Sequence, residues 1–264
     1  MGGDGNTHGV RVVSLACSNT EIVCALGCAD LLVGVDDHSD YPEAVVARLP
    51  RVGPDLQIDI EKVAALEPDL VLASLTVPGH ERVVAGLERA GLPYLAPAPV
   101  SVADVYADIR LVAERLLVSS RGDELVVDMQ RVLDASVPPA GRRPRVLVEW
   151  WPKPVIVPGR DSWVNQLLEV AGGDNPLGAR DVKSAPISDE EARAMRPDAI
   201  VISWCGVKPE KYRPDIVYRR EAWRGIPAIE NRRVFSVPEA CLGRPGPRLV
   251  DGCRALRDVV VACG

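Results

Sequence analysis

The sequence predicts an α/β protein with two similar α/β lobes, each built on a parallel sheet, joined by a single backbone helix. Strand-like and helix-like segments alternate along both halves of the chain. One segment recurs later in the chain, and a long amphipathic stretch separates the two copies. The 264 residues also exceed the roughly 100 to 150 residues of one typical domain. These observations together favour two related lobes.

The recurring segment is the clearest sign of a duplication. IDIEKVAALEPDLVLAS begins at Ile58 and ISDEEARAMRPDAIVIS begins at Ile187, an offset of 129 residues. Each copy predicts a short helix, a proline–aspartate junction and a buried strand, in that order. A helix–proline–strand junction is common, so coincidence is the alternative. Duplication is favoured because the segments before and after the two copies also correspond in order.

The stretch between the copies predicts an amphipathic helix over residues 122–136. Leu125, Met129 and Leu133 fall at helical spacing, and prolines follow at 138 and 139. At about 1.5 Å per residue, such a helix spans roughly 22 Å and would act as a stiff strut. We therefore expect the lobes to move little on ligand binding. The predicted organisation is an N-terminal lobe over 10–118, a connecting helix and linker over 119–141, and a C-terminal lobe over 142–264.

Helix-starting residues follow the first predicted strand of each lobe. The strands begin at Arg11 and Arg145. The expected starts of the next helices are Ser18, Asn19 and Thr20 in the first lobe and Asp161 in the second, and Asp59 caps the short helix of the first repeat. Gly27 is the expected stop of the first helix.

Composition limits the classes of partner and the location. The net charge of −6 and the lack of a basic stripe argue against nucleic acid. No apolar run approaches the roughly 18 residues that a membrane span needs. Seven cysteines without a CxxC pair are typical of reduced, buried thiols. We expect a periplasmic or cell-surface protein if a leader was trimmed, and a cytoplasmic one if the chain is native as written.

Motifs of the common catalytic classes are missing from the sequence. It contains no Walker loop, no GxGxxG after a strand, no GxSxG and no HExxH, and it has only three histidines. His38 lies among acids, but a solvated loop histidine is favoured over a metal ligand there. The sequence therefore predicts binding without catalysis, with no catalytic residues, no metal site and no catalytic cofactor.

Polar and aromatic residues follow the predicted strands, at the edge of a parallel sheet where ligands collect. The residues predicted to contact a ligand are Asp37, His38, Tyr41 and Thr76 in the first lobe, and Trp151, Asp161, Ser162, Trp163, Trp204, Cys205 and Arg244 in the second. Structural alternatives stay open for several of them. Asp161 would cap its helix, Trp163 would pack inwards, and Cys205 would be an ordinary small residue. Adjacent strand residues alternate, so only one of Trp150 and Trp151 can face the ligand.

Six motifs in order carry a family resemblance over nearly the whole chain. They are RVVSLACSNTE, VGVDDHSDYP, IEKVAALEPDLVLAS, AGGDNPLG, RPDAIVISWCG and RPGPRLVDG. With these motifs the sequence resembles the BtuF-like, cobalamin-binding branch of the ABC-transporter substrate-binding proteins, within the helical-backbone metal receptors. The resemblance implies a class III periplasmic-binding-protein-like fold and a shallow interlobe cleft that holds a corrinoid, a ferric siderophore or haem. Aromatic stacking and a few hydrogen bonds to peripheral amides suit such a large, flat ligand.

The resemblance also implies a partner. Members of this family dock on an ABC permease through one surface glutamate from each lobe, and each glutamate meets arginines. Glu81 stands at the place of the first docking acid, and the repeat offset of 129 residues leads to Glu210 as the second. The protein is then expected to be a monomer that reaches the membrane only through the basic docking surface of its permease. Two ordinary solvated acids are the alternative.

Other functions remain as alternatives. A haem receptor would use Tyr41 or His38 as the axial ligand, and a ferric-siderophore receptor would use basic residues such as Arg160, Lys183 and Arg244. An alternative of another class is a cytoplasmic two-domain enzyme that acts on a corrinoid precursor or a metallocluster. Asp161, His38 or Cys205 would carry its chemistry.

Overall fold

The computed structural model describes residues 9–135 and 141–263, and the chain forms two compact units. The N-terminal unit comprises residues up to Pro99 together with Tyr106–Val126. The C-terminal unit comprises Val100–Val105 and the residues from Val127 onwards. Both units are α/β and contain a parallel sheet, which confirms the predicted fold class. None of the described helices is long and apolar enough to cross a membrane.

The N-terminal unit is built on one four-stranded parallel sheet, in the order β2-β1-β3-β4. Its strands are short and buried, and helices or short turns connect them. Its elements, up to the helices shared with the next unit, are β1 (Val12–Ser14), α1 (Cys17–Ala25), η1 (Ala29–Leu31), β2 (Leu32–Val35), α2 (Glu43–Val46), α3 (Ile60–Ala65), β3 (Leu70–Leu72), α4 (His80–Arg89), β4 (Tyr94–Leu95), α5 (Val102–Arg115) and α6 (Ser119–Asp134).

The C-terminal unit combines two sheets. A parallel sheet has the order β10-β9-β5, and an antiparallel sheet has the order β6-β7-β8. Its elements are β5 (Val146–Glu149), β6 (Trp151–Pro152), β7 (Val155–Pro158), α7 (Trp163–Ala171), β8 (Ser184–Ile187), α8 (Asp189–Met195), β9 (Ala199–Ile202), η2 (Pro209–Lys211), α9 (Pro214–Tyr218), η3 (Glu221–Trp223), α10 (Pro227–Glu230), β10 (Val234–Ser236), α11 (Glu239–Leu242) and α12 (Leu249–Val261). The sequence patterns did not predict the antiparallel sheet.

The duplicated segments have matching backbone geometry. Asp59 caps α3 and Ser188, at the same offset, caps α8. Each helix is followed by a residue other than glycine in the left-handed region, Glu67 and Arg196, both with φ of 45°. An isolated left-handed residue that is not glycine is uncommon. Its recurrence at the same offset therefore supports the predicted duplication.

The same aspartate holds the first strand in both units. Asp69 Oδ2 accepts the backbone N–H of Arg11 at 2.8 Å, and Asp198 Oδ2 accepts that of Arg145 at 2.8 Å. In return, the backbone N–H of each aspartate donates to the carbonyl of the same arginine. Asp198 is 8% exposed and also receives a bidentate contact from Arg142. Although burial opposes ionisation, the Arg142 and Arg145 hydrogen bonds outweigh it and lower the pKa of Asp198.

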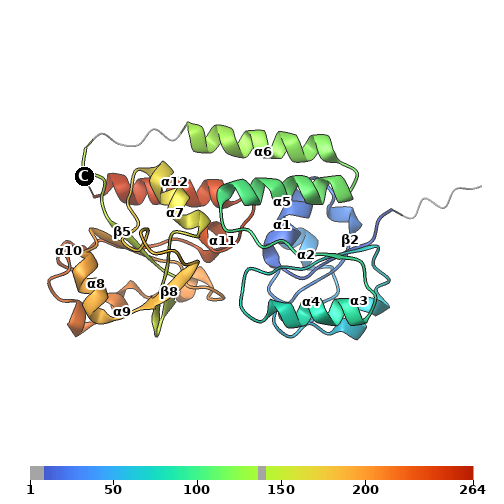
Figure 1. Ribbon diagram of the computed structural model, residues 1–264, viewed down its shortest axis with the longest axis horizontal. Helices are drawn as coiled ribbons and strands as arrows, with labels where there is room; N and C mark the ends of the chain where they lie inside the picture. Colours follow the sequence, from blue (N-terminus) through green and yellow to red (C-terminus); the bar gives the residue numbers. More distant parts are fainter. Residues whose placement is uncertain (1–8, 136–140, 264) are drawn as a thin grey trace, which may run out of the picture. The chain divides into compact units, whose positions relative to one another are not determined.

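The predicted amphipathic helix is present as α6, and it starts three residues before the predicted Gly122, at Ser119 (Figure 1). The division between the two units falls inside this helix, after Val126. Met129 and Leu133 are buried, as the apolar spacing predicts. The predicted last residue, Ser136, and the two prolines at 138 and 139 lie outside the described residues. The lobe boundaries at 118 and 141 stay a prediction.

Two predicted helix starts were wrong. Helix α1 begins at Cys17, and its N-cap residue Ala16 makes no side-chain capping bond. The expected starters lie inside its first turn, where Thr20 and Asn19 bond to other segments instead. Helix α7 is capped by Ser162, whose Oγ accepts the Val164 N–H at 3.3 Å, rather than by its exposed neighbour Asp161.

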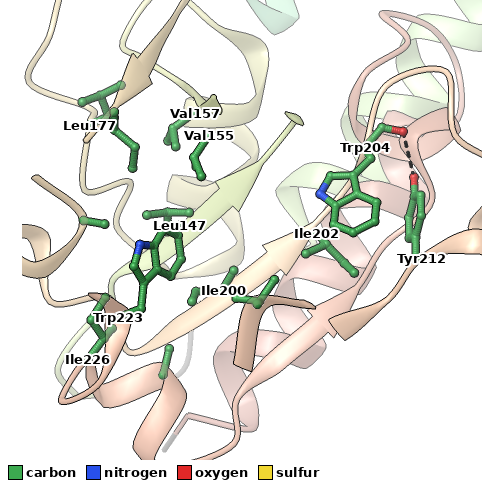
Figure 2. Close-up of a cluster of buried hydrophobic side chains, with 14 residues drawn as sticks. Leu147, Val155, Val157, Leu177, Ile200, Ile202, Trp204, Tyr212, Trp223 and Ile226 are labelled. Atoms are coloured by element: carbon green, nitrogen blue, oxygen red, sulfur yellow. Dashed lines mark hydrogen bonds between the residues drawn. The ribbon is translucent and has the colours of Figure 1, made fainter. Parts of the chain in front are cut away.

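Each unit has its own apolar core. In the N-terminal unit, residues from β1, β3, α3 and α4 pack together, with Val13, Val71 and Leu87 fully buried. In the C-terminal unit, Trp223 packs beside Leu147 and Ile226 (Figure 2). Helices α7 and α12 pack side by side in the same unit (Figure 1).

We predict that replacing the aspartate of the proline–aspartate junction lowers the free energy of unfolding by different amounts in the two units. Replacing Asp198 with Ala leaves the Arg145 N–H and the Arg142 guanidinium without their buried acceptor, so we expect a loss of about 1–3 kcal/mol in the free energy of unfolding. Asp69→Ala is the matched control, and because Asp69 is exposed, water can replace its carboxylate at smaller cost. Urea unfolding of both variants measures the difference. An equal or larger loss for Asp69→Ala would contradict this account.

Candidate functional site

The carboxyl ends of the parallel strands carry the polar loops of the N-terminal unit. A buried chain of hydroxyl groups and one carboxylate ties three of these segments together. Thr20 Oγ1 lies 2.8 Å from both Ser14 Oγ and Ser39 Oγ, and Ser39 Oγ donates to Asp36 Oδ1 at 2.5 Å. All four side chains are at most 1% exposed. The chain fixes the loop after β2 against the start of α1.

Asp36 is the carboxyl end of that chain. Burial raises the pKa of Asp36, and the hydrogen bonds from Ser39 Oγ and the His38 N–H act in the opposite direction. Arg51 Nη1 donates to the carbonyl oxygens of Asp36 and Ser39, both at 2.7 Å. The loop backbone is therefore held from two sides. Other side chains of this loop, which include His38 and Tyr41, are exposed.

Two histidines approach one carboxylate beside this loop. His38 Nε2 lies 3.7 Å from Asp55 Oδ1, and His80 Nε2 lies 3.5 Å from Asp55 Oδ2. The backbone N–H of Val77 donates to His80 Nδ1, which places the proton of a neutral His80 ring on Nε2, towards Asp55. The His80 contact is the main cause that lowers the pKa of Asp55, burial opposes it, and His38 adds to the lowering.

Several N-terminal residues that the sequence predicts for ligand contact lie near one another in these loops. Asp37 and His38 are exposed, and Tyr41 is 48% exposed. Thr76 is partly buried, and its Oγ1 lies 2.8 Å from Ser74 Oγ. Sequence reasoning missed Asp55, because its two histidine partners follow different strands and nothing in the local pattern links them.

A fully buried carboxylate organises the C-terminal unit at the end of β5. Glu149 is 0% exposed, and Arg220 contacts it through both nitrogens at 2.6 and 2.8 Å. Trp204 Nε1 donates to the same carboxylate at 2.9 Å. The Arg220 guanidinium also lies 4.4 Å from the centroid of the Trp223 ring, at cation–π distance. Sequence reasoning missed both charged residues, which are 71 positions apart.

Trp204 belongs to the core rather than to the exposed loops. It is 5% exposed, and its ring meets Tyr212 edge-on at 5.6 Å (Figure 2). Tyr212 donates its hydroxyl to the Trp204 carbonyl and accepts the Glu239 N–H. Burial raises the pKa of Tyr212 to about 12, so it stays protonated. This packing favours a supporting role for Trp204, and its predicted ligand contact stays a prediction.

The other predicted C-terminal residues differ widely in exposure. Trp163 is 7% exposed and donates Nε1–H to the Leu242 carbonyl, whereas Trp151 is 41% exposed. Ser162 is buried as the helix cap. Asp161 and Cys205 are exposed, and the Arg244 side chain is 12% exposed and paired with Glu239 at 3.2 Å. Of these predicted residues, Trp151, Asp161 and Cys205 are therefore exposed to solvent.

Three buried side-chain atoms have no hydrogen-bond partner among the described residues. They are His80 Nε2, Trp150 Nε1 and Ser203 Oγ. His80 Nε2 lies 3.5 Å from Asp55 Oδ2, beyond the distance of a normal hydrogen bond. Trp150 and Ser203 directly follow β5 and β9 of the C-terminal unit, whereas His80 is the first residue of α4 in the N-terminal unit. Buried polar groups rarely stay unpaired, so the pair after β5 and β9 favours this edge of that sheet as a functional one.

The two predicted docking acids lie on the surface. Glu81 is exposed in the first turn of α4, and hydrogen bonds from its own N–H and that of Gly79 lower its pKa. Glu210 is exposed in the short helix η2. Both acids are therefore available for a partner. In the part of the chain that the structure describes, no group of three or more histidine, cysteine, aspartate or glutamate residues could hold a metal ion.

The fold and these loops define a class of protein: a two-unit α/β binding protein whose polar side chains gather at strand ends. The family model described as "Periplasmic binding protein" matches residues 12–241. The chain therefore belongs to the periplasmic binding protein family, and it is a substrate-binding protein of the ABC-transporter type. This confirms the family resemblance seen in the sequence motifs.

Named relatives share nearly the whole chain. An uncharacterised ABC transporter substrate-binding lipoprotein of Bacillus subtilis, YvrC, is 32% identical over 258 residues, covering 95% of this chain and 79% of the relative. The vitamin B12-binding protein of Vibrio cholerae is 27% identical over 244 residues, covering 91% and 85%. The structure of the periplasmic heme-binding protein RhuT from Roseiflexus superposes with a TM-score of 0.79 at 28% identity, covering 97% and 98%. Such relatives give no support to the cytoplasmic alternative.

The lowered pKa of Asp55 predicts a pH-dependent contribution to stability. A carboxyl whose folded pKa is depressed stabilises the fold above its unfolded pKa, and this contribution is lost as the pH falls through the folded value. Asp55→Asn should therefore destabilise the protein at about pH 7, and the effect should fade below about pH 4. Urea unfolding at both pH values measures it, with the exposed Asp37→Asn as control. An effect that grows towards low pH would contradict the assignment.

Proposed function

We propose that the protein captures a corrinoid of the cobalamin type and delivers it to the permease of an ABC importer. The observation that carries this proposal is the likeness to vitamin B12-binding proteins of Vibrio over 91% of the chain. The motifs that resemble the cobalamin-binding branch support the same ligand. A corrinoid is large and flat, and its edge carries amide groups, so it suits exposed aromatic rings with polar side chains beside them.

The exposed residues at the strand ends are the proposed contacts. In the N-terminal unit these are His38, Tyr41 and Asp37, on a loop whose backbone is held by Asp36 and Arg51. A fixed loop loses little conformational entropy on binding, which favours affinity. In the C-terminal unit the proposed contacts are Asp161, Cys205 and one of the adjacent Trp150 and Trp151, with Trp163, Trp204, Ser162 and Arg244 as their supports.

Haem is the second candidate ligand, and specific observations favour it. His38 and Tyr41 are exposed and carry the imidazole and phenol groups that ligate haem iron in proteins. A protein named as heme-binding is also 28% identical to this chain. A ferric siderophore is less favoured, because Arg160 and Arg244 are each paired with an acid.

We further propose that the protein is a monomer and that it is located at the cell surface or in the periplasm.

A ligand titration tests the proposed function. Tryptophan emission and ligand absorbance are followed while cyanocobalamin, cobinamide, hemin and a ferric siderophore are added at micromolar concentrations. The corrinoids should quench the emission and bind, since aromatic residues lie at the strand ends. Saturable binding of hemin alone would replace the corrinoid with haem. No change with any of the four would refute both assignments.

The permease contact is tested separately by charge reversal. Glu81→Arg with Glu210→Arg should abolish uptake of the ligand and leave ligand affinity unchanged, because both acids are exposed and would meet a basic surface. Reversal of the exposed Glu61 and Glu190, which also occupy equivalent repeat positions, provides the matched control. Unimpaired uptake by the Glu81 and Glu210 double variant would refute the docking role.

A further inference from the structure

Trp150 differs from the other tryptophans of the chain. Four of the five indole N–H groups have an acceptor: Trp151 donates to the Lys153 carbonyl, Trp163 to the Leu242 carbonyl, Trp204 to Glu149 and Trp223 to Asp189. Trp150 Nε1 is buried and has no partner among the described residues. Its ring lies 6.4 Å from that of Trp163, at a tilt of 41°. Among the described residues, this indole is therefore held by packing, with no hydrogen bond from its N–H.

Ser203 presents a second unpaired group beside it. Ser203 is 0% exposed, and its Oγ has no partner in the described parts of the chain. In the parallel sheet, Glu149 is in register with Ile202, so the next residues, Trp150 and Ser203, are neighbours at the strand ends. The Ser203 N–H donates to the Glu149 carbonyl, and the Cys205 N–H donates to the Trp150 carbonyl, so the two segments stay side by side beyond the strands with a shift of one residue.

Both side chains leave the sheet on the same face. Side chains alternate along a strand, and Ile202 and Trp204 belong to the core cluster on one face. Glu149 bonds Trp204 and therefore lies on that face as well. Ser203 and Trp150 are thus on the opposite face. Two buried hydrogen-bond donors therefore share one face at the carboxyl end of adjacent strands, where ligands bind in open α/β sheets.

The hydrogen-bonding capacity of these two donors indicates which ligand group they can bind. An indole N–H only donates, and a serine hydroxyl donates readily, so both need an acceptor. Two neutral donors match a neutral carbonyl oxygen better than a carboxylate, whose buried charge would need a cation. We infer that Trp150 Nε1 and Ser203 Oγ form a subsite for a peripheral amide oxygen of the ligand. This inference rests on the proposed corrinoid function, because the edge of a corrinoid carries such amides.

The same features give the ligand access. Trp150 is only partly buried, and its indole breaks no hydrogen bond when it turns. Turning costs packing against Trp163 alone among the aromatic contacts. The N-terminal unit supplies the contrast: Ser74, at the repeat position equivalent to Ser203, already has Thr76 Oγ1 as a partner at 2.8 Å. The subsite is therefore specific to the C-terminal unit.

Ser203→Ala and Trp150→Phe test the subsite, since each removes one donor. Calorimetric titration with cyanocobalamin should show affinities about 2- to 10-fold weaker, the worth of one hydrogen bond. The free energy of unfolding of the free Ser203→Ala variant should be unchanged or higher, because an unpaired buried donor has been removed. Ser74→Ala, at the equivalent repeat position, is the matched control and should bind cyanocobalamin as the wild type does.

Several outcomes would overturn the inference. Unchanged affinity in both variants, whatever their stability, means that the two donors do not contact the ligand. Unchanged affinity with lower stability would assign them to a structural water. A loss with hemin that matches the loss with cyanocobalamin would contradict an amide oxygen, since hemin carries carboxylates instead. If the wild type itself binds no corrinoid, the proposed function fails, and this result is distinct from a variant that loses nothing.

Discussion

One hydrogen bond recurs in both units and positions the first strand of each. In it, the N–H of the arginine before that strand donates to the aspartate of the proline–aspartate junction. Asp69 and Asp198 each accept the N–H of the arginine that precedes the first strand. This contact fixes the register between the first strand and the strand after the repeat helix. With this register, the carboxyl ends of the two neighbouring strands lie close together. The loops that carry exposed polar and aromatic groups are consequently gathered at one edge of each sheet.

The two units support these loops with different chemistry. The N-terminal unit uses a buried chain of hydroxyls that ends at Asp36. The C-terminal unit uses the buried Glu149–Arg220 pair, with Trp204 as a further donor. Removing one partner of such a buried pair is strongly destabilising, because the other charge is left uncompensated. One repeated frame therefore carries a polar loop in one unit and, in the other, mostly buried tryptophans with Trp151 exposed.

Local patterns predicted the fold, whereas long-range contacts limited the prediction of the site. The N-cap at Asp59 and the amphipathic helix depend on residues close in sequence, and both were confirmed. The repeat is supported by the matching caps and left-handed residues at the same offset. The Glu149–Arg220 pair and the contacts of Asp55 join distant segments, so no local pattern could predict them. The sequence placed Trp204 after a strand, and only its side-chain partners reveal that it is buried.

We propose that loops at the carboxyl ends of the strands in each unit contact the ligand. Hydrogen exchange of the full chain, measured with and without saturating cyanocobalamin, tests it most directly. Amides in the loops over 36–41, 74–80, 150–163 and 203–206 should gain protection when the ligand binds. The helices α9 and α10 should exchange as before. Protection confined to those helices, or to one unit alone, while binding is saturated would contradict the account.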